Sequence, residues 1–426
     1  MRVLAAFLLL LLTGCSVAGG SASGRTTVTF RLWDQQVAGA YEESFAAFEK
    51  QHRDIDVVVQ VVPWADYWTK LPADIAAGTA ADIFWTNTSN FGLYADNGHL
   101  SPITDGQQAG WTRSVIGLYT RNGKLWGVPQ LWDSIALFYH KDLVAKAGVD
   151  PATLVWNPSG IGDTFLPAAR KLTVDEAGRS ADRKDFDPKA IARYGFNAAL
   201  DHQAIGGDFV GSNGGTWQDG DRFDFAGEPE TVAAIQYVVD LINKHHVAPS
   251  AADTNTDGDK TLRLFTQGRL ALFQSGPYHL KSVQEGAAFD WGLAPLLTGP
   301  AGRVSVVHGV AAVASAKTPH PDATAKVLSW IGSAEGVRPI AAGGYGFPGV
   351  VAAEPEFTAY WQRQGVDVRP FLDAANGTTF PAPAGPRVQA GTTAALPILQ
   401  EVFLGRLGVP EGLRRAQDAA NQAVAE

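Results

Sequence analysis

The feature that most limits the fold of this chain is an alternation of strand and helix patterns that begins near residue 26. The segments are, in order, a strand at 27–33 with Val28, Phe30 and Leu32 on one face, a helix carrying Tyr41, Phe45 and Phe48, a strand at 55–62, a helix at 71–77 and a strand at 82–85. The strand at 55–62 is rich in β-branched residues, which is typical of a strand buried on both faces of a parallel sheet. This order predicts an open α/β layer whose ligand crevice lies at the carboxyl ends of the strands.

The middle of the chain changes character and indicates a second lobe. Prolines punctuate the helical patterns between residues 151 and 188, and a glycine-rich loop spans 211–217. Helical patterns at 230–244 and 322–331, with a strand pattern at 304–314, indicate that the chain returns late to the first lobe. A length of 426 residues is enough for two or three domains.

The charge and cysteine content exclude several classes of partner. Asp and Glu total 43 and Lys and Arg total 34, so the formal net charge is −9. No excess positive charge is available for nucleic-acid phosphates or a wide anionic membrane surface, and we expect no nucleic-acid partner. The single cysteine, Cys15, cannot form an internal disulfide or a cysteine-based zinc cluster.

The N-terminal segment has the pattern of an export signal. Arg2 precedes an apolar run at 3–12, which is too short for the ~20 residues of a membrane-spanning helix. The run ends at Cys15 in a motif, LTGC, that resembles the bacterial lipobox, where the cysteine is lipid-modified. We therefore expect a signal peptide at 1–14, a lipidated tether at 15–25 and an extracytoplasmic body that Cys15 anchors to the cell membrane. The alternative is a buried cysteine after a plain signal peptide.

Aromatic residues lie beside polar residues in several predicted loops. Sugars present apolar C–H faces and hydroxyl groups, so a carbohydrate cleft needs aromatic platforms and hydrogen-bonding side chains that do not react. The candidate ligand-binding residues from this pairing are Trp33, Asp34, Trp64, Asp66, Trp68, Asn87, Trp132, Asp133, Asn213 and Trp217. Trp33 and Asp34 could equally cap the first helix. The tryptophans that we interpret as packing residues are Trp111, Trp126, Trp291, Trp330 and Trp361.

Six short motifs also follow one another in a fixed order. They are FAAFEK at 45–50, GTAADIF at 78–84, KLWGVP at 124–129, ALFYHKDL at 136–143, FTQGRLALF at 265–273 and SGPY at 275–278. Together they resemble the extracellular solute-binding proteins of bacterial ABC importers, in the family 1 or oligosaccharide-binding branch. Two positions depart from that family: Ala81 replaces its usual proline, and His140 replaces its usual asparagine.

The resemblance implies an α/β fold of the periplasmic-binding-protein type II, in which two lobes, each a sheet flanked by helices, close on a ligand around a hinge. The first lobe would comprise 26–133 and 301–345, and the second 134–300 and 346–426. Further candidate ligand-binding residues are Ser275, Gly276, Tyr278, His308, Gly309 and Tyr345. The implied function is a non-catalytic, monomeric lipoprotein that captures a carbohydrate, either an oligosaccharide or an amino sugar, and delivers it to an ABC permease.

Two other functions stay open at this point. Aromatic and carboxylate pairs also build glycoside hydrolase sites, so a cell-surface glycoside hydrolase is one alternative. A binder of glycerol-phosphate diesters is the other, and it needs an Arg or a helix N-terminus at the phosphate. The segment 253–264 lacks the final Glu of a calcium loop, and no P-loop or HExxH motif is present, so we expect neither a metal nor a cofactor.

Overall fold

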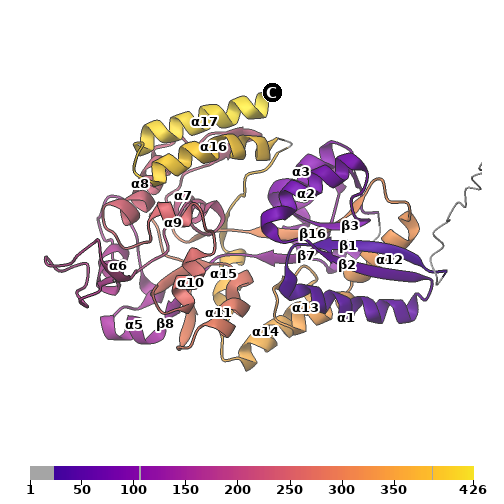
Figure 1. The fold of residues 1–426 in the computed structure, drawn as a ribbon, viewed down its shortest axis with the longest axis horizontal. Helices are drawn as coiled ribbons and strands as arrows, with labels where there is room; N and C mark the ends of the chain where they lie inside the picture. Colours follow the sequence, from indigo (N-terminus) through magenta and orange to yellow (C-terminus); the bar gives the residue numbers. More distant parts are fainter. Residues whose placement is uncertain (1–23, 105–106, 386) are drawn as a thin grey trace, which may run out of the picture.

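Two lobes lie side by side along the long axis of the molecule, each built on its own β-sheet (Figure 1). The computed structural model describes residues 24–104, 107–385 and 387–426. The expected signal peptide, Cys15 and the tether up to residue 23 lie outside the described residues. Within the described residues, no helix combines the length and the hydropathy needed to cross a membrane.

The first lobe contains the larger sheet. Its strands are, in spatial order, β17 (Phe347–Pro348), β7 (Val128–Asp133), β16 (His308–Ser315), β3 (Ile83–Asn87), β1 (Thr26–Leu32) and β2 (Ile55–Val61), and β4 (Leu100–Ser101) pairs with the end of β16. β1 pairs in parallel with both β2 and β3, as the alternating pattern predicts. β16 comes from a distant part of the chain and is antiparallel to β3 and β7, so the sheet is mixed.

Helices cover both faces of this sheet (Figure 1). They are α1 (Gln35–Gln51), α2 (Trp64–Ala77), α3 (Thr88–Asp96), α4 (Arg113–Leu118), α12 (Pro321–Ile331), α13 (Ala334–Ala342) and α14 (Glu354–Arg363). The side chain of Asp34 caps α1, as one of the two interpretations predicted. α2 ends at Gly78, whose left-handed φ of 72° suits glycine.

The start of α2 corrects one sequence-based expectation. Trp64 and Trp68 were expected in a loop, but they occupy the first two turns of this helix. Tyr67, Leu71 and Ile75 recur every four residues and are all buried, so the apolar face of the helix extends further towards its N-terminus than the pattern at 71–77 indicated. Trp132 and Asp133 also lie in regular structure, as the last residues of β7.

The second lobe contains a three-stranded antiparallel sheet in the order β13 (Leu272–Ser275), β8 (Ala136–His140) and β14 (Trp291–Ala294). A short parallel pair, β15 (Val304–Val306) and β18 (Thr378–Phe380), lies beside α7. The longer helices around these strands are α5 (Lys141–Ala147), α6 (Phe165–Leu172), α7 (Gly207–Ser212), α8 (Pro229–Asn243), α10 (Lys260–Thr266), α11 (Leu280–Gly286), α15 (Arg369–Asn376), α16 (Val388–Phe403) and α17 (Val409–Ala425). α16 and α17 pack against each other and against α8.

The chain passes between the lobes where β7 leads into β8, where β15 leads into β16, and between α14 and α15. The strand pattern at 304–314 is therefore two strands, one in each lobe. β17 pairs with β7, and α14 packs on α13, so residues 347–363 lie with the first lobe. The expected boundary at 301 differs from the structure because β15 pairs with β18 in the second lobe. The expected boundary at 346 differs because β17, a two-residue strand, leaves no periodic pattern in the sequence.

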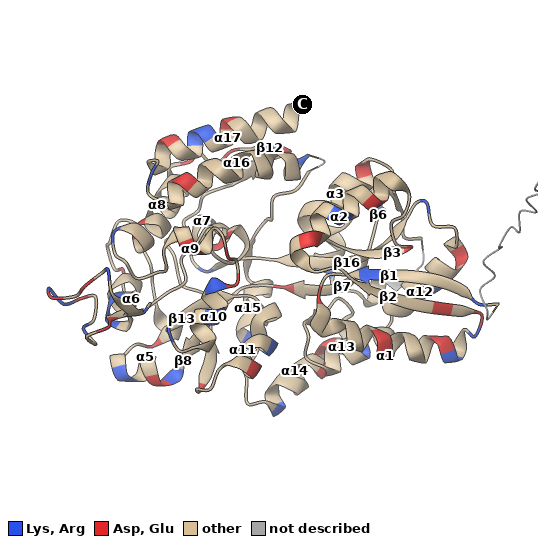
Figure 2. Ribbon diagram, in the orientation of Figure 1, with Lys and Arg blue, Asp and Glu red and all other residues tan. Residues whose placement is uncertain are grey.

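The positions of the packing tryptophans and of the charged residues agree with the sequence-based expectations. Trp111, Trp291, Trp330 and Trp361 are buried, which confirms their interpretation as packing residues, and Trp126 is half-buried against the same core. Acidic and basic residues are mixed along α5 and α17 (Figure 2). This mixed pattern gives neither helix the basic stripe of a nucleic-acid interface.

Candidate ligand-binding site

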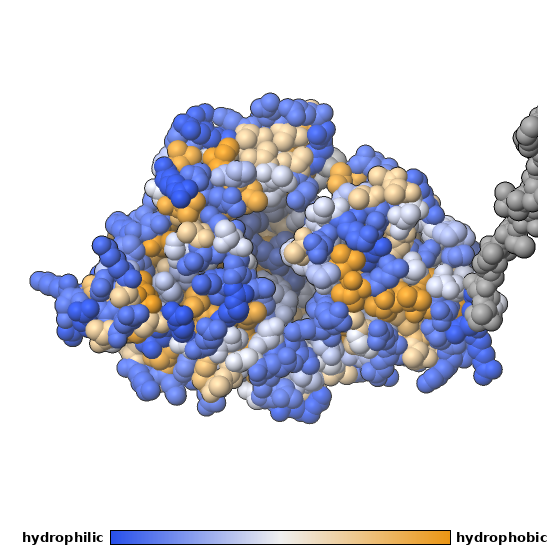
Figure 3. Space-filling view, in the orientation of Figure 1, coloured by the Kyte–Doolittle hydropathy of each residue, from blue (hydrophilic) through white to orange (hydrophobic). Residues whose placement is uncertain are grey.

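A cleft between the lobes consists of two connected chambers, and the space-filling view is hollowed there (Figure 3). The polar chamber has a volume of about 370 Å³, and its lining includes Asp34, Trp132, Asp133, Tyr278 and Tyr345. The apolar chamber has a volume of about 350 Å³, and its lining includes Trp217, Phe223, Phe225, Leu396 and Leu399. The residues that line both chambers are Trp64, Asn87, Asp201, Gln203 and His308. The two chambers are therefore parts of one site.

Three polar residues of the cleft cap helices. Asp34 follows β1 and accepts a hydrogen bond from the backbone N–H of Gln36 at 2.8 Å. Asn87 ends β3 and accepts bonds from the backbone and side chain of Asn90. Asp201 precedes the π-helical turn η3 (His202–Gly206) and accepts from the N–H of Ala204 at 3.0 Å. Helices that begin at the cleft thus bring capping carboxylate and amide groups to it.

Tryptophans form a connected cluster on the first-lobe side of the cleft. The Trp33 ring lies 4.9 Å from the Trp85 ring, 5.4 Å from the Trp64 ring and 5.5 Å from the Trp68 ring. Trp85 is 1% exposed, whereas Trp64 is 51% exposed. Trp33 packs edge-to-face with both Trp64 and Trp85, which is favourable, so a buried ring supports an exposed ring that faces the cleft.

Two more aromatic platforms come from separate elements. Trp132 stacks on Phe347 of β17 with ring centroids 4.5 Å apart. Trp217 stacks on Phe225 at 4.4 Å and lies 4.7 Å from the ring of His202. Each tryptophan is backed by another ring, which fixes the plane that a ligand would meet.

Asp133 connects the two sides of the cleft. Its carboxylate accepts a hydrogen bond from Nε2 of Gln203 at 3.1 Å, and it pairs in register with His308 of the neighbouring strand. Burial raises the pKa of Asp133 to about 7, and the bond from Gln203 opposes that rise. Burial also raises the pKa of Asp34. Burial leaves these carboxyl groups with few hydrogen-bond partners, so a ligand that donates a hydrogen bond to them is favoured.

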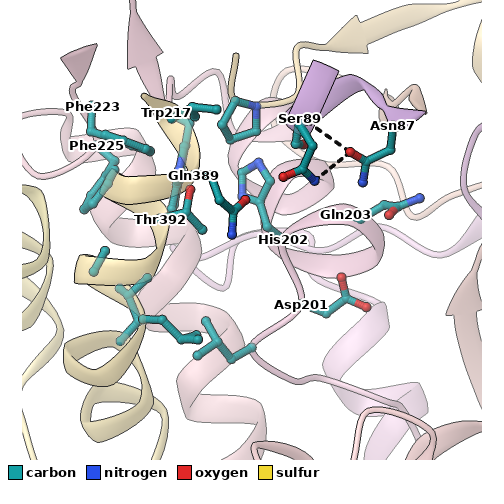
Figure 4. A pocket seen from close by; sticks show the side chains of 18 of the residues that line it. Asn87, Ser89, Asp201, His202, Gln203, Trp217, Phe223, Phe225, Gln389 and Thr392 are labelled. Atoms are coloured by element: carbon teal, nitrogen blue, oxygen red, sulfur yellow. Dashed lines mark hydrogen bonds between the residues drawn. The ribbon is translucent and has the colours of Figure 1, made fainter. Parts of the chain in front are cut away.

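Histidines line both chambers and are held in their neutral form. Burial lowers the pKa of His202 to about 3, with a smaller contribution from His308, and lowers the pKa values of His279 and His308 to about 4. Both ring nitrogens of His202 and Nε2 of His308 are buried without a hydrogen-bond partner among the described residues. His202 lies between Trp217 and the Asn87 side of the cleft (Figure 4). Neutral imidazoles offer a donor and an acceptor to a ligand.

The charged residues of the cleft are all acidic. Asp34, Asp133 and Asp201 line it, and neither chamber has a Lys or Arg among its described lining residues. No group of three or more His, Cys, Asp or Glu side chains within the described ranges is arranged to hold a metal ion. The site therefore suits a neutral or cationic ligand better than an anionic one.

Most of the residues expected at the site line the two chambers. They are Trp33, Asp34, Trp64, Trp68, Asn87, Trp132, Asp133, Trp217, Tyr278, His308, Gly309 and Tyr345. Gly309 also has a packing reason, because a Cβ atom there would lie 3.0 Å from the ring of Tyr119. Lining shows position only, so the binding role of each residue stays a prediction.

Four expected residues do not line either chamber. Asp66 is exposed on α2, and Asn213 donates from Nδ2 to the carbonyl of Glu230 at 2.6 Å. The remaining two, Ser275 and Gly276, act on neighbours that do line the polar chamber. Ser275 Oγ lies 2.8 Å from Nδ1 of His279, and a Cβ on Gly276 would clash with the ring of Tyr278.

Sequence reasoning missed most of the second-lobe side of the cleft. The missed residues include Asp201, His202, Gln203, Phe225, His279 and Gln389. The run Asp201–Gln203 has one usable signal, a capping residue followed by polar residues before the apolar pair at 204–205. His279 directly follows the SGPY motif, and that position is the signal that could have identified it.

Comparison with known proteins decides the family. The model of the bacterial extracellular solute-binding proteins matches residues 33–338, which is well over half of the chain. This chain belongs to that family. As a bacterial extracellular solute-binding protein it serves an ABC transporter, and the family is non-catalytic. The glycoside hydrolase alternative is therefore set aside.

Individual relatives agree with this solute-binding protein assignment. The crystal structure of UspC from M. tuberculosis is 45% identical, with a TM-score of 0.77 over 93% of this chain and all of UspC. The substrate-binding protein Lmo0181 of Listeria monocytogenes, solved with cycloalternan, has a TM-score of 0.81 at 20% identity over 94% of this chain and 99% of its own. The maltodextrin-binding protein MdxE of Bacillus subtilis is 24% identical over 76% of this chain and 74% of its own. The expected periplasmic-binding-protein fold is confirmed.

Proposed function

We propose that this solute-binding protein captures a carbohydrate, either an oligosaccharide or an amino sugar, and delivers it to the permease of its ABC transporter. The observation that carries the proposal is the lining of the cleft, where backed tryptophan rings alternate with carboxylate, amide and neutral imidazole groups. Rings pack on the C–H faces of a sugar, and the polar groups pair with its hydroxyls. The names of MdxE and of the Lmo0181 complex, which concern a maltodextrin and cycloalternan, support the same ligand class.

The binding mechanism is closure of the two lobes on the ligand. Trp33, Trp64 and Trp132 face the cleft from the first lobe, whereas Trp217 and Tyr278 face it from the second. A ligand that contacts both sets binds the closed arrangement more tightly than an open one, and so shifts the population towards it. The bond between Gln203 and Asp133 links the same two sides.

The charge of the cleft narrows the ligand class further. Three carboxylates without a Lys or Arg among the described lining residues favour a neutral sugar or a protonated amino sugar. A glycerol-phosphate diester would have its negative charge beside Asp34, Asp133 or Asp201 with no basic side chain to offset it. No observation therefore favours the phosphodiester alternative.

Attachment to the membrane through lipid on Cys15 belongs to the same proposal. Cys15 lies outside the described residues, and the LTGC motif supports its modification. We further propose that the protein acts as a monomer. Cells expressing Cys15→Ser are expected to release the protein from the membrane fraction, and retention of the variant would contradict the anchor.

The direct test is a screen of neutral oligosaccharides, amino sugars and glycerophosphodiesters against the full chain carrying Cys15→Ser. A carbohydrate at a hundredfold excess over its Kd should stabilise the fold by about 2.7 kcal/mol, which a thermal-shift assay detects. Chromatography of the recovered sugar should show no turnover. Stabilisation by a phosphodiester and by none of the carbohydrates would overturn the proposal.

A further inference from the structure

The inner part of the apolar chamber has a lining that a sugar alone does not match. Phe223, Phe225, Ile235 and Leu413 are among its lining residues and are almost completely buried, so they form the apolar floor of this part of the cleft. Phe223 and Phe225 lie on the side opposite Asn87 and Gln203, with His202 between them (Figure 4). Hydroxyl groups placed against such a surface would lose their hydrogen bonds to water without replacement.

One face of α16 carries the change from polar to apolar along the chamber. The side chains on that face are Gln389, Thr392, Leu396, Leu399 and Phe403, which follow one another at spacings of three or four residues. The first three are exposed and the last two are buried. A ligand along this face meets an amide and a hydroxyl at one end and hydrocarbon at the other.

Exposed apolar side chains mark the same site. Leu396 is 43% exposed and Trp64 is 51% exposed, and both line the apolar chamber. Exposed apolar surface in a groove is typical of a ligand-binding site, because leaving it in water is unfavourable. α16 contacts α3 of the first lobe, so this apolar surface lies within the cleft.

We propose that the physiological ligand is an amphiphilic glycoside, with its sugar in the polar chamber and an aryl or short alkyl group in the apolar chamber. This inference rests on the proposed carbohydrate-binding function. The two chambers share Asn87, Asp201 and Gln203, so one molecule can occupy both. The apolar group removes hydrocarbon surface from water at the end of the cleft where a further sugar unit would leave hydroxyls unpaired.

The test uses matched methyl, phenyl and n-hexyl glycosides of glucose, galactose, mannose, glucosamine and N-acetylglucosamine. Each is titrated by calorimetry into the full chain carrying Cys15→Ser. We expect the phenyl or hexyl glycoside of at least one sugar to bind about tenfold more tightly than its methyl glycoside.

A variant tests whether the gain in affinity arises in the apolar chamber. Leu396→Asp places a charge beside the apolar group at an exposed position, so it should abolish the tenfold preference of the phenyl or hexyl glycoside over the methyl glycoside. The matched control is Ile161→Asp, which changes a side chain that is 79% exposed and outside both chambers, and it should keep the preference.

The outcomes separate this inference from the proposed function. Equal affinity for methyl, phenyl and hexyl glycosides overturns the amphiphile and leaves carbohydrate binding intact. If Leu396→Asp still prefers the phenyl or hexyl glycoside, the apolar group binds elsewhere, and the inference is also overturned. Binding of none of these glycosides, together with a negative carbohydrate screen, contradicts the proposed function as well.

Discussion

The first lobe forms one wall of the cleft, here called the first wall, and the second lobe forms the other, the second wall. The two walls differ in how their side chains are held in place. On the first wall, Trp33 directly follows β1 and contacts the rings of Trp64, Trp68 and Trp85. The first two lie in the first two turns of α2, and Trp85 lies within β3. On the second wall, Asp201 caps a single π-helical turn that begins with His202 and Gln203, and both ring nitrogens of His202 lack a partner among the described residues.

This difference indicates that the buried rings of the first wall mainly stabilise the fold, whereas the polar groups of the second wall mainly contribute to ligand binding. The first wall is preformed, because its rings support one another within the core of the lobe. Both walls retain buried polar atoms without a partner among the described residues. They are the indole nitrogens of Trp68, Trp85 and Trp132 and Nε2 of His308 on the first wall, and both ring nitrogens of His202 on the second. Such atoms cost stability until a ligand pairs with them. Substitutions of the buried rings of the first wall should therefore lower the free energy of unfolding, whereas substitutions of the polar residues of the second wall should mainly lower ligand affinity.

The largest expected effect is the loss of stability in Trp85→Ala. Trp85 is 1% exposed and contacts both Trp33 and Tyr41, so its removal leaves a cavity. We expect the free energy of unfolding to fall by about 3–5 kcal/mol, measured by urea denaturation. Trp64→Ala is the matched control on the same wall, because its ring is half exposed and should cost much less stability. Equal losses in the two variants would show that the first wall is not supported from the core.

A smaller effect is expected for Asp133→Asn, which lies where the walls meet. Removing the charge weakens a hydrogen bond from a sugar hydroxyl, so affinity should fall about tenfold to a hundredfold in calorimetry. Without ligand and at about pH 4, where both side chains are neutral in the folded chain, the free energy of unfolding should change little, because the amide oxygen can still accept from Gln203. A loss of stability without a loss of affinity would place Asp133 in the structural set instead.

The pH dependence of the same variant follows from the raised pKa of Asp133. The folded chain binds this proton more tightly than the unfolded chain, whose carboxyl has its ordinary pKa of 3.8. This contribution to stability is therefore complete below about pH 4 and is lost as the pH rises to about 7. Relative to the parent chain, Asp133→Asn should gain stability between pH 4.5 and 7.5 in urea denaturation. A difference that does not change with pH would contradict the buried carboxyl.

On the second wall, His202→Phe should affect stability and binding in opposite directions. Removing two unpaired buried nitrogens should leave the free energy of unfolding unchanged or raise it by about 1 kcal/mol. Loss of a neutral hydrogen bond to the ligand should weaken binding about twofold to tenfold. Denaturation and calorimetry on one preparation test both effects, and a less stable variant with full affinity would overturn the division between the walls.

The smallest effect is expected for Asp66→Ala. Asp66 is exposed on α2 and lies outside both chambers, although the sequence suggested it as a ligand-binding residue. Both the free energy of unfolding and ligand affinity should stay within about 0.5 kcal/mol of the parent. A clear loss of affinity would extend the first wall beyond the two chambers.

The two walls also differ in how many of their residues could be predicted from the sequence. Residues of the first wall directly follow predicted strands or start predicted helices, so Trp33, Asp34 and Asn87 were identified from local patterns. The second wall combines η3, the loop of Trp217 and α16, which lie far apart in the chain. Asp201, His202 and Gln203 share no periodic pattern, because a π-helical turn is short and irregular.

The sequence by itself determined the strand and helix order of the first lobe and, through its motifs, the family. Those features depend on periodicity and on short segments, which neighbouring residues decide. Only the tertiary structure decided that β17 joins the sheet of the first lobe, that Gln203 meets Asp133, and that α16 closes an apolar chamber beside a polar one. These contacts join residues tens to hundreds of positions apart, and burial of their surfaces, which no local pattern records, selects them.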